Sequence, residues 1–251
     1  MNQLDKDERM VCRDRHQRPG FAPVMYQRWQ NLLFLHWTFD PVDVQRLLPP
    51  GLTLDTWEGN AWVGVVPFEM RNIRPWWSPV VPYISNFLEL NLRTYVIDEQ
   101  GRPGVYFISL NADRWVACMC GRWWFRLPYH WSSMRCQHLT NGSVDYHFRR
   151  FGAATDTACH YRYQPMGTPS PAAPGTLEYF LVERYFLFTQ RGQQLCYGQV
   201  HHPPYPVQTA ELEICENRFL SLDGLPNRSD PPVHVAYVTG VNVDVFPLIP
   251  V

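Results

Sequence analysis

The clearest hydrophobic pattern in the chain is a two-residue alternation between positions 87 and 96. One face would carry Phe87, Glu89, Asn91, Arg93 and Tyr95, and the other Leu88, Leu90, Leu92, Thr94 and Val96. This period is typical of a β-strand with one polar and one apolar face. Turn-forming residues at 98–104 precede a second β-rich run, 105–110. The two runs are therefore predicted to pair as an antiparallel hairpin.

The pattern changes after Leu110. Residues 112–125 lack the alternation and include small side chains that allow close packing against a sheet. Asn111 could cap a helix here, and Pro128 would end it, because proline disfavours the helical conformation of the preceding residue. A buried helix is the favoured interpretation, and a buried strand is the alternative.

Other runs read mostly as short strands. We expect strands at 31–39, 52–56, 60–68, 135–140, 143–150, 158–164, 185–189, 193–201, 211–215 and 233–245, short helices beginning at Asp40 and Thr176, and loops at 71–82 and 165–175. Asn141-Gly142 is a strong hairpin-turn sequence. Many strands, few helices and no β-α-β rhythm favour a mainly β (α+β) fold, an antiparallel closed barrel with a few flanking helices.

Composition narrows the class of protein. A net charge of −1 predicts no nucleic-acid or membrane partner. No apolar run reaches the length of a spanning helix or of a signal peptide, so we expect a cytoplasmic location. Seven cysteines without framework spacing suit reduced thiols. Residues 1–20 read as a mobile charged arm and 21–251 as one domain, with a homo-oligomer left open.

Several segments together resemble a known family. They are LLPPGLTLDTWEGNAWVGVVPF, ELNLRTYV, GRPGVYFISL, RLPYHW and LVERYF. From about Tyr26 onward the chain resembles the YqjF-like family of uncharacterised bacterial proteins (domain of unknown function 2071), in the acetoacetate decarboxylase superfamily. The resemblance implies the barrel, and an active-site glutamate of the decarboxylases matches Glu89. The alternative for the polar face of this strand is ordinary solvent exposure.

The same resemblance raises the question of the catalytic amine. The decarboxylases use a lysine that condenses with a keto group, and two lysines follow the proline that Pro128 matches. Here those positions hold Tyr129 and His130, and Lys6 is the only lysine of the chain. Schiff-base chemistry is therefore not expected.

The candidate catalytic residues are Glu89, Arg93, Tyr129 and His130, and the candidate ligand-binding residues are Asn91 and Tyr95. Tyr129 and His130 could serve as acid, base or hydrogen-bond donor, or could simply pack. No cofactor is expected. No metal is expected either, because Cys118-Met119-Cys120 and His201-His202 lack zinc-site spacing.

Three functions remain open from the sequence. The first is an enzyme that acts non-covalently on a small organic acid or carbonyl compound. The second is a non-catalytic protein that binds a small molecule in the barrel. The third is an interaction module that docks through Trp76-Trp77 and Trp123-Trp124, which requires these side chains to be exposed.

Overall fold

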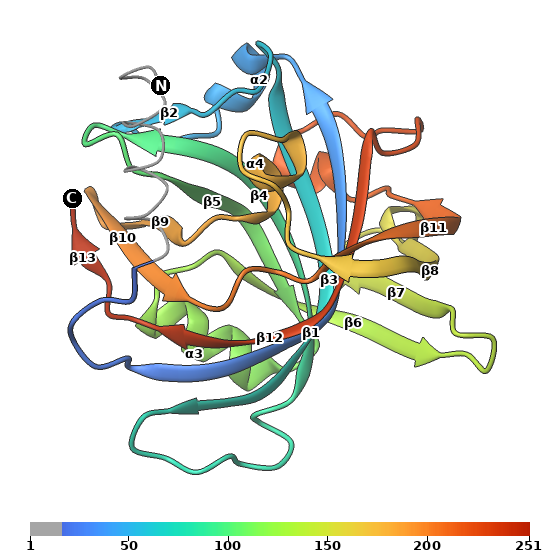
Figure 1. Ribbon diagram of the computed structural model, residues 1–251, viewed down its shortest axis with the longest axis horizontal. Helices are drawn as coiled ribbons and strands as arrows, with labels where there is room; N and C mark the ends of the chain where they lie inside the picture. The colour runs from blue at the N-terminus through green and yellow to red at the C-terminus, as the bar shows by residue number, and fades with distance from the viewer. Residues whose placement is uncertain (1–16) are drawn as a thin grey trace.

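The computed structural model describes residues 17–251, and a 13-stranded sheet forms most of this region (Figure 1). The strands are β1 (Met25–Phe39), β2 (Leu52–Leu54), β3 (Ala61–Pro75), β4 (Phe87–Asp98), β5 (Pro103–Ala112), β6 (Tyr129–His138), β7 (Val144–Arg150), β8 (Cys159–Ser170), β9 (Phe186–Arg191), β10 (Gln194–His201), β11 (Val207–Glu216), β12 (His234–Val245) and β13 (Ile249–Pro250). The helices are α2 (Pro41–Gln45), α3 (Trp115–Trp124) and α4 (Leu177–Val182), with 3-10 turns η1 (Thr155–Thr157) and η2 (Leu220–Asp223).

The strand order is β13-β10-β9-β5-β6-β7-β8-β11-β12-β1-β3-β4-β2. Additional pairings join β5 to β4 and β10 to β12, so the sheet returns on itself through hydrogen-bonded neighbours. Neighbours pair antiparallel except β5–β6 and β5–β9. The prediction of a mainly β, largely antiparallel fold is confirmed, as is the hairpin of β4 and β5.

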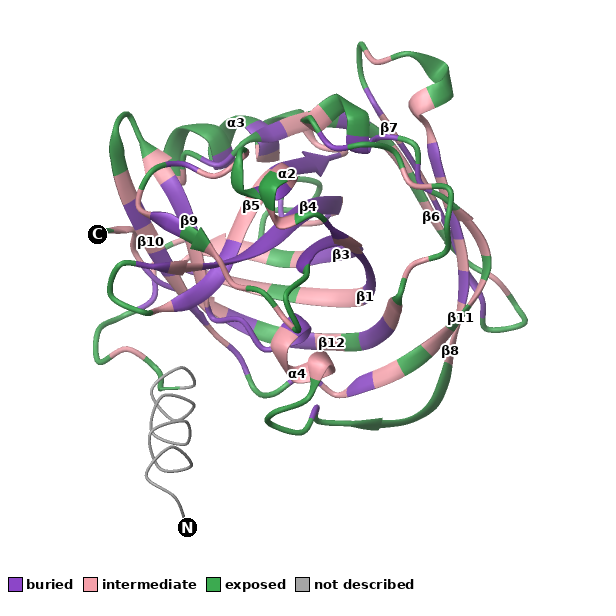
Figure 2. Ribbon diagram, turned by 90° about the horizontal axis from the view of Figure 1, so that it is seen from above, coloured by how far each residue is buried: buried purple, intermediate pink, exposed green. Residues whose placement is uncertain are grey.

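The alternation along β4 separates two cores. Leu90 and Leu92 pack into one of them, with Trp37 from β1 and aromatic residues of β7 and β8. Phe87 and Tyr95, on the other face, belong to a second core with side chains of β1 and β3. Figure 2 shows buried residues along much of β3 and β4, whereas α3 is largely exposed. Both faces of β4 are therefore covered, including its polar one.

The short helices begin where the sequence predicts. Asp40 accepts a hydrogen bond from the Val42 backbone amide at the start of α2, and Pro41 occupies its first turn. Thr176 caps α4 in the same way, through the amide of Tyr179. Gly142 has a φ of 89° in the β6–β7 turn, a conformation that glycine adopts without steric cost.

Several sequence predictions were wrong in detail. Asn111 lies in β5 and does not cap α3, which begins at Trp115. Its side chain accepts a hydrogen bond from Arg150 instead. Residues 165–170 extend β8 and pair with β11 instead of forming a loop. Likewise β3 continues to Pro75, into the predicted 71–82 loop.

Part of the predicted N-terminal arm, residues 1–16, lies outside the described residues. The segment 17–20 is described, and Arg18 contacts Asp244 there with Nε 3.1 Å from Oδ2. Between residues 17 and 251, no helix combines the length and the apolar character required to cross a bilayer.

Candidate functional site

A cavity of about 280 Å³ lies on the polar side of β4. Apolar and aromatic side chains from β1, β3, β4, β5 and α3 form most of its wall, among them Trp29, Phe68, Phe87 and Phe107. Glu89, Asn91 and Arg93 line it from β4, and Tyr129 lines it from the start of β6. A largely apolar cavity with a few polar groups is typical of small-molecule sites.

The strand period places the three polar residues of β4 on the cavity side. Their exposed fractions are 3% for Glu89, 6% for Asn91 and 8% for Arg93. Polar groups this deeply buried require hydrogen-bond or charge partners, because burial without them is costly. The partners that each residue has, or lacks, therefore indicate what the cavity can bind.

Glu89 has one side-chain partner, Tyr129, whose hydroxyl donates to Oε2 at 2.9 Å. Burial raises the pKa of Glu89 to about 8, although this hydrogen bond opposes the increase. At neutral pH the Glu89 carboxyl is thus mostly protonated. Burial likewise raises the pKa of Tyr129 well above its ordinary value.

Helix α3 holds Tyr129 in place. A Cβ atom on Gly121 would lie 2.4 Å from the Tyr129 ring, so the absence of a side chain on this helical turn makes room for the ring. Arg122, the next residue, donates from Nε to the backbone carbonyl of Tyr129 at 2.6 Å. The Gly121-Arg122 pair thus positions the ring and the backbone of Tyr129 together.

Arg93 is a buried cation without a carboxylate partner among residues 17–251. Its Nη2 donates to the Leu181 carbonyl at 3.1 Å, and its guanidinium carbon lies 5.2 Å from the centroid of the Phe34 ring. Within the described part of the chain, its Nε has no hydrogen-bond partner, and neither does Oδ1 of Asn91, two residues earlier. By contrast, Arg184 at the same cavity pairs with Asp55 at 2.6 Å.

Two of the predicted site residues do not line the cavity. Tyr95 lies behind Arg93, where its hydroxyl donates to the Leu181 carbonyl at 2.8 Å and lies 2.6 Å from Nε2 of His36. His130 follows Tyr129 on β6, and successive strand residues point to opposite faces. Burial lowers the pKa of His130, and Arg150 lowers it further.

The sequence did not predict three polar contributors to the cavity wall, Gln27, Arg184 and Tyr205. Arg184 lies in the LVERYF segment at the end of α4, where its Nε donates to the Phe180 carbonyl at 2.6 Å. Glu183 of that segment accepts from the Tyr185 hydroxyl and from the Tyr205 backbone amide.

Two exposed residues, Trp124 of α3 and Ile84 of the segment after β3, also line the cavity. The four tryptophans that were suggested as a docking surface are exposed, by 63% for Trp76, 65% for Trp77, 79% for Trp123 and 44% for Trp124. The condition set for the interaction hypothesis is therefore met.

The geometry can be compared with known proteins. Residues 26–242 match the family DUF2071, described as an uncharacterized conserved protein. The Bacillus subtilis (strain 168) protein YqjF, also uncharacterized, is 40% identical over 215 residues, which cover 85% of this chain and 87% of YqjF.

Solved structures share the fold at low sequence identity. The enduracididine biosynthesis enzyme MppR, complexed with pyruvate, has a TM-score of 0.61 at 14% identity over 93% of both chains. An acetoacetate decarboxylase-like enzyme from Sphingomonas wittichii RW1 has a TM-score of 0.60 at 14% identity, covering 92% of this chain and 94% of that one. The chain thus belongs to the DUF2071 family, and its fold is that of the acetoacetate decarboxylase-like proteins.

Proposed function

We propose that this protein binds a small organic acid with an apolar or ring portion in its cavity, without forming a covalent bond to it. The observation that carries the proposal is the buried guanidinium of Arg93, which lines the cavity and has no carboxylate partner among the described residues. A guanidinium engages a carboxylate through two parallel hydrogen bonds. The ligand would therefore supply the missing anion.

Glu89 does not compete for Arg93 when it is protonated. Its pKa of about 8 keeps the carboxyl neutral at pH 7. The β4 face then presents one positive charge, an unsatisfied acceptor at Asn91 Oδ1 and a neutral carboxyl that can donate a proton. This combination favours an acid that also carries a hydroxyl or amine group to donate to Asn91.

The remaining wall favours an apolar ligand body. Phe68, Phe87 and Phe107 offer ring faces and edges, and burying an apolar group against them is favourable by about 25 cal/mol per Å². We further propose that the sheet acts as a closed barrel around this cavity, which would exclude water from the Arg93–carboxylate contact. Exclusion of water strengthens such a contact.

No lysine lines the cavity among residues 17–251, which supports a non-covalent mode, because an iminium needs an amine. Glu89 and Tyr129 could then act as a general acid–base pair on a bound carbonyl compound. A non-catalytic binding protein is the alternative. Glu89→Gln separates them, since in an enzyme turnover is lost while binding is retained.

A thermal-shift screen of chelator-treated protein tests the proposal. Small aromatic or branched organic acids should raise the melting temperature more than simple sugars or nucleotides do. Arg93→Ala should abolish the shift given by the best acid, whereas Arg135→Ala, an exposed arginine on β6, should retain it. The proposal fails if nucleotides give the largest shift or if Arg93→Ala leaves the acid response intact.

Docking of a protein partner is a second candidate function, favoured by the four exposed tryptophans, of which Trp124 also lines the cavity. Apolar side chains clustered on a surface often mark an interaction site. With a second copy of this chain as the partner, sedimentation velocity should show self-association. The double variant Trp77→Ser/Trp123→Ser should reduce it. A monomer at all concentrations would exclude the homo-oligomer.

A further inference from the structure

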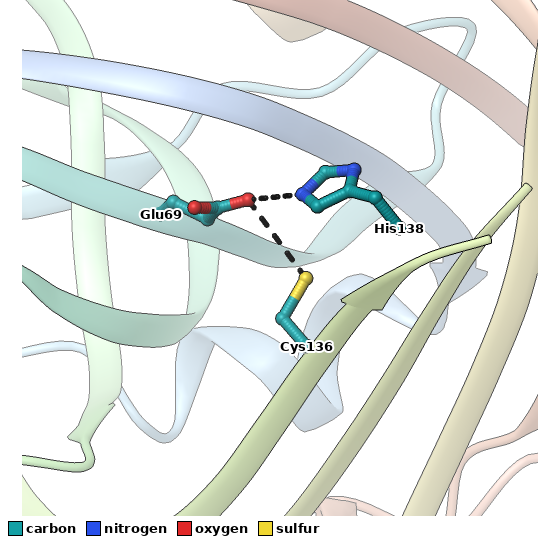
Figure 3. A group of neighbouring side chains, drawn as sticks. All are labelled: Glu69, Cys136 and His138. Carbon is teal, nitrogen blue, oxygen red and sulfur yellow. Dashed lines mark hydrogen bonds and ion pairs between the residues drawn. The ribbon is translucent and has the colours of Figure 1, made fainter. Parts of the chain in front are cut away.

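Three potential metal ligands meet outside the cavity: Glu69, Cys136 and His138 (Figure 3). Cys136 and His138 lie two residues apart on β6 and so project to the same side. Glu69 lies between Phe68 and Met70 of β3, both of which line the cavity, so its side chain points away from the cavity. The group is therefore separate from the site described above.

We propose that Glu69, Cys136 and His138 bind a thiophilic divalent cation of the zinc class. Each residue offers one donor atom, and these three atoms lie within 4.8 Å of one another. Glu69 Oε1 lies 2.7 Å from His138 Nε2 and 3.9 Å from Cys136 Sγ.

The distances between the three donor atoms suit a tetrahedrally coordinated ion after small movements of the side chains. With zinc–ligand bonds of about 2.0–2.3 Å, donor atoms lie about 3.4 Å apart. His138 is the residue free to adjust, because 53% of its side chain is exposed, compared with 5% for Glu69. Three protein ligands leave the fourth position to water, as in zinc sites that keep an open coordination position.

Neighbouring residues already orient the carboxylate. Asn31 donates from Nδ2 to Glu69 Oε1 at 2.7 Å, and Arg71 contacts the other oxygen, Oε2. Asn31 is itself held by the Tyr237 hydroxyl, 2.6 Å from its Oδ1. Support of this kind around a ligating carboxylate is common in metal sites.

The backbone of β1 contributes to this support. Asn31 has a φ of 53°, in the left-handed region, at the register shift between β1 and β3. Few residues other than glycine adopt this conformation, although asparagine is enriched among them. The irregularity turns the Asn31 amide toward Glu69. The strained backbone at Asn31 thus helps to hold the Glu69 carboxylate, one of the proposed ligands, in its orientation.

Binding exchanges a proton for the ion. The Cys136 thiol donates its hydrogen toward Glu69 Oε1. On binding, the sulfur–hydrogen bond breaks, the proton leaves to solvent and the thiolate keeps the electron pair that it donates to the cation. No oxidant or reductant takes part. Affinity should therefore increase with pH, and each ion bound should release one thiol proton.

Titration of the chelator-treated full-length protein with cobalt(II), then zinc(II), tests the site. One cobalt per chain should give visible bands of tetrahedral cobalt and a thiolate-to-cobalt charge-transfer band, and zinc should displace it. Cys136→Ser should abolish the charge-transfer band, and His138→Gln should weaken binding by at least about tenfold. Zinc should also protect Cys136 from alkylation, as mapped by mass spectrometry.

Matched controls come from similar residues elsewhere. Cys215→Ser changes another partly buried thiol, and His147→Gln changes the separate group of Asp145, His147 and His160. Both variants should retain the charge-transfer band. The proposal is overturned if cobalt gives no such band, if Cys136→Ser keeps it, or if zinc leaves Cys136 alkylation unchanged. The alkylation measurement uses the wild-type protein, so it tests the metal site even if a variant folds poorly.

Discussion

The Tyr129 hydroxyl donates a 2.9 Å hydrogen bond to Glu89 Oε2 inside a mainly apolar cavity. This bond links the start of β6 to the beginning of β4. It opposes the effect of burial on Glu89, whose pKa still reaches about 8. Titration of Glu89 should therefore be coupled to folding.

We expect the free energy of unfolding to decrease as pH rises through the window between about 4.5 and 8. In this window the folded chain holds the Glu89 proton and the unfolded chain does not, because the pKa is 4.5 when unfolded and about 8 when folded. The slope that this residue contributes is about 1.4 kcal/mol per pH unit, and it vanishes above pH 8. Urea unfolding of wild type and Glu89→Gln across the window measures it. Parallel pH profiles for the two proteins would disprove the raised pKa.

Tyr129→Phe should raise the Glu89 pKa further. The hydroxyl hydrogen bond favours the ionised carboxylate, so its removal leaves burial less opposed. Carbon-13 NMR of the labelled glutamate carboxyl should show the titration midpoint move upward. A midpoint that stays in place or falls would show that the hydroxyl does not stabilise the carboxylate.

Gly121→Ala should destabilise the protein by about 1–3 kcal/mol, the usual cost of overpacking. The new methyl group would lie 2.4 Å from the Tyr129 ring, which has little room to move. Gly20→Ala is the control, because a Cβ there meets nothing within 4 Å. Thermal unfolding of both variants gives the comparison, and equal stabilities would contradict the proposed fit of Tyr129 against α3.

Arg150→Met should cost about 3–5 kcal/mol of stability, because it leaves a buried carboxylate unpaired. Arg150 contacts both oxygens of Asp223, at 3.0 and 2.8 Å, and donates to Asn111 at 3.0 Å. The control is Arg218→Ala, which removes a solvent-exposed partner of Glu216 and should change stability by less than about 1 kcal/mol. Denaturant titration that gives equal losses would argue against the network around Arg150.

Borohydride reduction in the presence of pyruvate or acetoacetate should leave no adduct on the cavity residues. The described part of the chain contributes no lysine to the cavity wall, so no amine there can form an iminium. Peptide mass mapping after reduction checks this, with a lysine-dependent decarboxylase as the positive control. A stable mass increase at Lys6, with activity lost in Lys6→Ala, would reverse the conclusion.

The sequence predicted the hairpin of β4 and β5 well, because a two-residue period shows directly which side chains share a face of a strand. Alternation could not show that the polar face of β4 is also covered, and the family resemblance was needed to place Glu89 and Arg93 in a cavity. His130 was grouped with Tyr129 because both stand at the lysine positions of the decarboxylases, and the strand that starts at Tyr129 was not recognised. Once β6 begins at Tyr129, the same period sends the two side chains to opposite faces.

Longer-range partners explain the other differences. Asn111 resembles a helix cap in its local sequence, yet its partner Arg150 is 39 residues away. Tyr95 shares the face of Arg93 but bonds to the Leu181 carbonyl at the end of α4, 86 residues away. The short sequence around each residue contains no information about these partners.

The two covered faces of β4 also have a consequence for folding. If β4 paired with β3 one residue out of register, Glu89, Asn91 and Arg93 would enter the core that holds Leu90 and Leu92, and those leucines would face the cavity. Three polar groups without partners in that core would make the shifted pairing strongly unfavourable. The polar residues that line the cavity thereby also make one alignment of β4 with β3 the correct one.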